Sequence, residues 1–152
     1  MKHYLMVDLG TGNSRVALVD SDGGILGLRT YTNVYHRASG YEEGQSFLPE
    51  DWAALLLQGC RELCREHPDI QVDAVSAAGA RQSFVLLDGN GRAFLGLPNI
   101  DNRGRAYMAQ VPEHDEIYRL SGKWATEDFG AAKLLGLRMQ HPEQYEAVES
   151  VL

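Results

Sequence analysis

The first residues of the chain that could do chemistry form a short polar, glycine-rich loop behind an apolar run. The run ends at Asp8, and the loop consists of Gly10, Thr11, Gly12, Asn13, Ser14 and Arg15. Glycines let a backbone approach a ligand closely and point several N–H groups at one place, which suits a phosphate. The polar side chains add hydrogen-bond donors, and Arg15 adds a planar cation that matches phosphate oxygens. The spacing therefore predicts a phosphate-binding loop over residues 10–15.

A carboxylate stands just before this loop. Asp8 is placed to hold a hydrated magnesium ion rather than the phosphate itself, because Mg²⁺ keeps several waters and takes one or two carboxylates. The alternative is a long hairpin turn stabilised by its Asp and Asn side chains, with Arg15 as a surface cation. Two common phosphate loops are excluded: the chain has no Gly-x-x-x-x-Gly-Lys-Ser/Thr, and no Gly-x-Gly-x-x-Gly between a strand and a helix.

Polar side chains gather again where later strands are expected to end. Arg81 and Gln82 interrupt one apolar pattern, and Asn99, Asp101 and Arg103 follow the next. In an open α/β sheet the strand ends are the usual place for a small-molecule site, so we predict that these residues bind a substrate. The alternatives are solvated loop residues at 81 and 82, a helix cap at Asp101, and a structural ion pair between Asp101 and Arg103.

The elements that must position these residues begin with consecutive antiparallel strands. We expect three of them, over 4–8, 14–20 and 24–33, with a turn at 21–24. Residues 34–48 have no period and contain Gly40 and Gly44, so we expect a surface loop there. A helix should begin at Pro49 and end before Pro68, because apolar residues from Trp52 to Cys64 recur at i, i+3, i+4 and i+7.

The rest of the chain is expected to add strands and then helices. A strand over 72–78 follows the long helix, and strand–helix–strand order favours parallel pairing with the opening sheet. A hairpin of 83–87 and 92–97 turns at 88–91. The remainder is predicted to be helical, over 104–111, 113–120, 129–139 and 142–152. We interpret the end at Leu152, on an apolar helical pattern without a cap, as a truncation.

Composition excludes several classes of function. The chain has 152 residues, a net charge of −7 and a pI of about 5.1, so a broad basic face for nucleic acid is not expected. The first residues are not expected to act as a signal peptide, and no run approaches the ~20 apolar residues of a membrane span. Cys60 and Cys64 have no histidine nearby and are interpreted as apolar packing residues. These features indicate a reduced, cytoplasmic protein with neither a nucleic-acid nor a membrane partner.

Several segments resemble the FGGY carbohydrate kinases. Residues 8–15 resemble the first phosphate motif of that family, Asp-x-Gly-Thr-x-Ser-x-Arg, and Pro49-x-x-Trp52 resembles its helix start, with Leu48 in place of an Asp. The segment 76–83 resembles its strand-end substrate segment, with Arg81 matching a common Arg and Gln82 where a Glu often stands. Residues 99–103 are similar to Trp-x-Asp-x-Arg, with Asn99 in place of Trp, and are most similar to the autoinducer-2 kinase branch. Residues 118–122 and 133–135 fit the stretch that follows.

The resemblance implies a fold and a reaction. The fold is the α/β ribonuclease-H-like half-domain of actin, hexokinase and heat-shock ATPases, a mixed sheet of three antiparallel strands and a parallel one with flanking helices. The reaction is transfer of the ATP γ-phosphoryl group to a hydroxyl of a sugar, polyol or related small molecule, with ATP and Mg²⁺ as cofactors. Residues 1–152 would be the N-terminal portion of the first kinase domain, inactive alone, with the catalytic base beyond Leu152.

Two other classes with this fold stay open at the level of the sequence. One is an actin-like assembly ATPase or a chaperone-type ATPase, which gives no reason for the polar residues at 81–82 and 99–103. The other is a ribonuclease-H-like nuclease, in which Asp8 would be a two-metal ligand and a second aligned carboxylate would be required. The oligomeric state, a homodimer included, is not fixed by the sequence.

Overall fold

The computed structural model describes residues 1–38, 43–111 and 113–152. The chain divides into two compact units. The first unit contains Met1–Val34 and Glu50–Ala80, and the second contains Tyr35–Pro49 and Arg81–Leu152. The phosphate-loop candidates therefore belong to the first unit, and the substrate candidates belong to the second.

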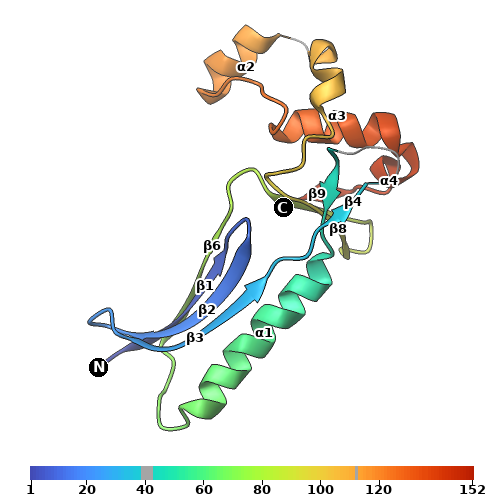
Figure 1. Ribbon diagram of the computed structural model, residues 1–152. Helices are drawn as coiled ribbons and strands as arrows, with labels where there is room; N and C mark the ends of the chain where they lie inside the picture. The colour runs from blue at the N-terminus through green and yellow to red at the C-terminus, as the bar shows by residue number, and fades with distance from the viewer. Residues whose placement is uncertain (39–42, 112) are drawn as a thin grey trace. The chain divides into compact units, whose positions relative to one another are not determined.

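The first unit contains a four-stranded mixed sheet (Figure 1). Its strands are β1 (His3–Leu9), β2 (Asn13–Asp20), β3 (Ile25–Thr32) and β6 (Ala74–Gly79), in the order β3-β2-β1-β6. The first three pair antiparallel, and β6 pairs parallel with β1, as the sequence predicted. Alternate residues of β2 are buried (Ser14, Val16 and Leu18), which is the period of two that a half-buried strand requires.

The helix of the first unit is α1 (Pro49–Glu66), within the predicted limits. Proline suits a first helical turn, and Glu50 and Asp51 complement the positive end of the helix dipole. Leu63 packs into a core with Leu5, Val16 and Leu18 from the sheet. Gly59 allows this close approach, because a Cβ there would come within 2.8 Å of the Tyr31 hydroxyl.

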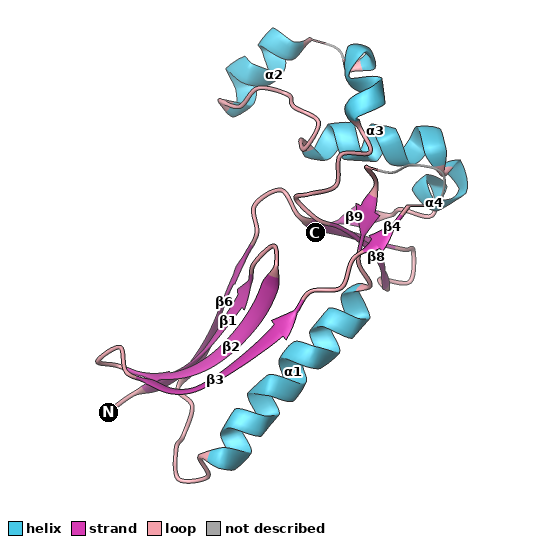
Figure 2. Ribbon diagram, in the orientation of Figure 1, coloured by secondary structure: helices cyan, strands magenta, loops and turns pink. Residues whose placement is uncertain are grey.

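The second unit contains short strands and helices (Figure 2). Its strands are β4 (His36–Arg37), β5 (Gln45–Ser46), β7 (Phe84–Leu87), β8 (Ala93–Leu97) and β9 (Ser150–Val151). Its helices are the 3₁₀ helix η1 (Arg105–Gln110), α2 (His114–Ser121), α3 (Gly130–Gln140) and α4 (Pro142–Glu146). Leu86, Leu97 and Leu137 form its core, so α3 packs on the β7–β8 hairpin.

Three predictions about local structure were wrong in part. The segment 34–48 is not only loop: β4 pairs with β5, and Phe47 exchanges two backbone hydrogen bonds with Gly96, at 2.9 and 3.0 Å. Gly40 of that prediction lies outside the described residues. The segment 104–111 forms a 3₁₀ rather than an α-helix. The last segment leaves the helix after Glu146 and ends in β9, because Leu152 and Val85 exchange backbone hydrogen bonds at 2.8 and 2.9 Å.

None of the helices in the described part of the chain has the length and apolar composition that a membrane span requires.

The core of the first unit gives a stability prediction. Leu63→Ala should lower the free energy of unfolding by about 2–4 kcal/mol, because the side chain is 0% exposed and its removal leaves a cavity between helix and sheet. Leu57→Ala, on the same helix but 53% exposed, should change it by less than about 0.5 kcal/mol. Urea denaturation measures both, and equal losses would contradict the assigned packing.

Candidate functional site

The loop between β1 and β2 contains two glycines with different surroundings: one is packed against the backbone, and the other has open space beside it. The Gly10 N–H donates to the Asn13 carbonyl at 3.1 Å, and a Cβ at Gly10 would come within 2.9 Å of that same oxygen. Position 10 therefore needs glycine to keep the loop tight. At Gly12 a Cβ would meet no described atom within 4 Å. The loop is thus held from one side and open at its tip, where a ligand can approach the backbone.

The loop is held by Asn33, which the sequence analysis did not single out. The Asn33 side-chain amide donates to the carbonyls of Gly10 at 2.7 Å and Thr11 at 3.1 Å, and its backbone N–H donates to Gly12 at 3.1 Å. The Ser14 hydroxyl in turn donates to the Asn33 side-chain oxygen at 2.7 Å. Three successive loop carbonyls are thereby paired with one residue.

The predicted phosphate-binding residues differ in their exposure to solvent. Ser14 is buried, and its hydroxyl supports Asn33. Gly12 is exposed, whereas Gly10, Thr11 and Asn13 are half-buried. The structure therefore makes residues 10–12 the loop, and it places Asn13 and Ser14 at the start of β2, where the Ser14 hydroxyl supports Asn33.

Asp8 and Arg15 face each other across β1 and β2 at the base of the loop. They are register partners, and Arg15 Nη1 lies 3.2 Å from Asp8 Oδ2. The two side chains are 46% and 53% exposed for arginine and aspartate, and an ion pair so exposed contributes at most about 1 kcal/mol. Such a pair can exchange partners, which leaves the carboxylate able to face a cation and the guanidinium able to face a phosphate.

The second group of candidates flanks β7 and β8 in the second unit. Arg81 is exposed, and Gln82 adopts a left-handed backbone conformation with φ of 64°. The backbone N–H of Asn99 donates to the Ser83 hydroxyl at 3.0 Å, so the segment before β7 and the segment after β8 are joined. Arg81, Gln82 and Asn99 therefore lie on segments that are joined to each other next to strand ends, and their binding of a substrate stays a prediction.

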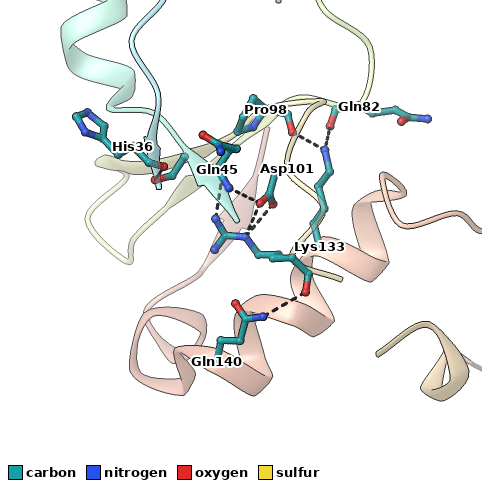
Figure 3. Close-up of polar contacts among 9 residues, drawn as sticks. His36, Gln45, Gln82, Pro98, Asp101, Lys133 and Gln140 are labelled. Carbon is teal, nitrogen blue, oxygen red and sulfur yellow. Dashed lines mark hydrogen bonds and ion pairs between the residues drawn. The ribbon is translucent and has the colours of Figure 1, made fainter. Parts of the chain in front are cut away.

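Asp101 and Arg103 form a buried ion pair (Figure 3). The Arg103 Nε donates to both Asp101 oxygens, at 3.0 and 2.8 Å, and the Gln45 N–H donates to Oδ1 at 2.8 Å. Arg103 Nη2 donates to the Gln45 carbonyl at 3.0 Å. Burial raises the pKa of Asp101, and the Arg103 charge and the Gln45 N–H oppose that rise.

This arrangement decides between the structural alternatives for Asp101. The helix-cap alternative is wrong, because Gly104 is the N-cap of η1 and makes no side-chain cap bond. The carboxylate is 0% exposed, and both of its oxygens accept hydrogen bonds from the protein. The ion-pair alternative therefore describes Asp101 and Arg103, and a substrate contact of Asp101 stays a prediction. Arg103 reaches a hollow of about 180 Å³ that is also lined by Arg37, Ser46 and His141.

A third buried charge, Lys133, was also missed. It is 0% exposed, and its ammonium donates to the carbonyls of Gln82 at 2.9 Å and Pro98 at 2.6 Å. Burial lowers the pKa of Lys133 to about 8, against the opposing charges of Asp101 and Asp128. A sequence signal existed: Lys133, Gly136 and Leu137 share the buried face of α3 at helical spacing.

The comparisons with known proteins define the class. The sequence model of the FGGY family of carbohydrate kinases, N-terminal domain, matches residues 3–152, and the chain belongs to this family. The chain is 39% identical over 150 residues to a Bacillus subtilis protein assigned as a sugar kinase, covering 98% of this chain and 31% of that protein. It is 28% identical over 159 residues to the autoinducer-2 kinase of Salmonella choleraesuis, covering 98% of this chain and 30% of that protein.

Solved structures agree with the fold. The crystal structure of xylulose kinase from Rhodospirillum rubrum matches with a TM-score of 0.82 at 18% identity, over 99% of this chain and 32% of that chain. The predicted mixed sheet of a ribonuclease-H-like, actin-like half-domain is therefore confirmed. The chain spans about a third of the length of the relatives it matches. Family membership favours the kinase interpretation over the assembly-protein and nuclease alternatives.

The loop geometry gives a prediction for Asn33. Asn33→Asp keeps the shape and the acceptor for Ser14 but replaces the amide donor by an oxygen that faces the Gly10 and Thr11 carbonyls. We expect a loss of about 1–3 kcal/mol of unfolding free energy, because those acceptors lose their donor. Gln71→Glu, the same amide-to-acid change at an exposed position of the first unit, should be near neutral. Thermal unfolding measures both variants, and an N33D protein as stable as the unaltered protein would contradict the role of Asn33 in holding the loop.

Proposed function

We propose that this chain supplies the phosphate loop and part of the acceptor site of an ATP-dependent carbohydrate kinase. The complete kinase transfers the γ-phosphoryl group of ATP to a hydroxyl of a sugar, polyol or related polyhydroxy compound. The observation that carries this proposal is the Gly10–Gly12 loop, open at its tip and flanked by the exchangeable Asp8–Arg15 pair, in a chain of the FGGY family.

The loop residues stabilise the transferred group by position and charge. Phosphoryl transfer depends chiefly on holding the phosphates in line and neutralising their charge. A Cβ at Gly12 would meet no described atom within 4 Å, which leaves a phosphate room to approach the backbone there, and Thr11 and Asn13 flank that position. Arg15 would leave Asp8 for a phosphate oxygen, a move that the weak exposed pair permits.

The same geometry fits a magnesium ion bound together with ATP. The described residues contain no group of three or more His, Cys, Asp or Glu that could hold a metal alone. Mg²⁺ in such sites is held by one or two carboxylates and by substrate phosphates, so the single half-exposed Asp8 is a sufficient protein ligand. When bound, the ion neutralises the negative charge of the phosphate oxygens. No residue of this chain is assigned as the catalytic base, which we place outside residues 1–152.

The second unit supplies hydrogen-bonding groups for the hydroxyls of the sugar or polyol that accepts the phosphoryl group. Arg81 is exposed and Gln82 half-exposed, so a guanidinium and an amide are available at the end of β6 and before β7. Asn99 lies on the segment that is joined to Ser83 by a backbone-to-hydroxyl hydrogen bond. We assign acceptor binding to Arg81, Gln82 and Asn99, with Asp101 and Arg103 forming the buried frame beneath them.

Arg81 provides the test of this assignment. In the complete kinase, Arg81→Ala should raise the KM for the acceptor roughly 10- to 100-fold, because charged hydrogen bonds to hydroxyls are lost. The KM for ATP should change less than about twofold, because the phosphate loop is untouched. Arg61→Ala, an exposed arginine on α1, is the matched control and should leave both values unchanged. Equal effects of R81A on both substrates would contradict the assignment.

A further inference from the structure

The ammonium of Lys133 is buried against backbone carbonyls. Its hydrogen bonds reach Gln82 O at 2.9 Å and Pro98 O at 2.6 Å (Figure 3). Gln82 is itself an assigned acceptor-binding residue, and Pro98 directly precedes Asn99, another. The side chain rises from α3, so one residue of a scaffold helix holds the two segments that carry the assigned acceptor contacts.

The backbone at Gln82 needs such support. Its φ of 64° lies in the left-handed region, which residues other than glycine, asparagine and aspartate seldom adopt. A conformation of this kind persists only where surrounding contacts fix it, and it is common at ligand-binding sites. The Lys133 hydrogen bond to the Gln82 carbonyl is a contact of that type, because it fixes the peptide group that follows the strained residue.

A second tether acts on the same two segments. The Asn99 N–H donates to the Ser83 hydroxyl at 3.0 Å, and the Asp101 N–H donates at 3.0 Å to the Pro98 carbonyl that Lys133 also binds. Lys133 and Ser83 therefore hold residues 81–83 against residues 98–101 from two points. The relative placement of Arg81 and Asn99 depends on these tethers.

We propose that Lys133 is a positioning residue for acceptor binding, which fixes the Arg81–Gln82 corner against the Pro98–Asp101 segment through its two carbonyl contacts. The proposal rests on the proposed function, because it assumes that these segments bind the acceptor. Lys133 touches no substrate in this account. Its effect reaches the acceptor through the backbone of Gln82 and through the segment that begins at Pro98.

Amide hydrogen exchange of the 152-residue chain tests the tether without any activity. In Lys133→Met, which keeps the length of the side chain but removes its donors, the peptide covering 98–102 should exchange about tenfold faster or more. The strands β1 and β2 of the other unit should be unchanged. Lys123→Met is the matched control: this lysine of the same unit faces Asp128 at 3.8 Å, and its loss should leave that peptide unchanged. Unaltered exchange in K133M would overturn the proposal.

Kinetics of the complete kinase test the link to the acceptor. K133M should raise the acceptor KM about tenfold while the ATP KM stays within about twofold, a split that general destabilisation does not produce. Faster exchange with an unchanged acceptor KM would overturn the positioning role. If the unaltered complete protein phosphorylates no sugar or polyol, the proposed function fails, and the exchange result still decides whether the tether exists.

A milder variant keeps the test decisive if K133M does not fold. Ser83→Ala removes only the acceptor of the Asn99 N–H and leaves Lys133 in place. It should loosen the 98–102 peptide and raise the acceptor KM in the same direction as K133M. If S83A changes neither quantity, the Asn99–Ser83 hydrogen bond is no tether, and the two-point attachment on which the proposal is built is wrong.

Discussion

The interaction on which the β1–β2 loop depends is the pairing of its carbonyl groups with Asn33. Its side-chain amide and its backbone N–H bind the carbonyls of Gly10, Thr11 and Gly12. Leaving polar backbone groups unpaired in a partly buried site costs folding free energy. The pairing with Asn33 removes that cost on one side of the loop, so the opposite side can stay open. The phosphate-loop assignment depends on that division between a paired side and an open side.

In the second unit, buried charged side chains pair the backbone groups of the loops. Asp101 accepts from the Gln45 N–H, Arg103 donates to the Gln45 carbonyl, and Lys133 donates to two further carbonyls. Buried ionic groups are tolerated only where hydrogen bonds compensate for their lost hydration. These three charges meet that condition through one another and through the backbone, and their hydrogen bonds join the segments at Gln45, Gln82 and Pro98. In this way the segments that flank the β7–β8 hairpin, where the proposed acceptor contacts lie, are held in place.

The parts of the fold that repeat regularly could be predicted from the sequence. Alternation in β2 and helical spacing in α1 identified the sheet and its helix, and chain order identified the parallel strand β6. The last segment could not be decided in this way, because a short apolar run suits a helix or a strand and long-range pairing with β7 selects the strand. The candidate site residues were chosen by type and spacing, which carry no information on exposure: Asp101 was predicted to bind a substrate, and its side chain is fully buried in the fold.

Both supporting residues were missed for the same physical reason. Asn33 acts on a loop about twenty residues earlier in the chain, and Lys133 acts on carbonyls 35 and 51 residues away. Side chain-to-backbone contacts over such distances leave no spacing pattern. Lys133 alone had a local signal, its place on the buried face of α3.

A crystal structure of the complete kinase with ADP, magnesium and an acceptor would show directly whether the β1–β2 loop binds phosphate. We expect phosphate oxygens about 3 Å from backbone N–H groups of residues 11–13, with Arg15 turned from Asp8 toward them, while the Gly10 N–H stays bonded to the Asn13 carbonyl. Phosphates bound elsewhere, with the Asp8–Arg15 pair intact and the loop facing only solvent, would contradict it.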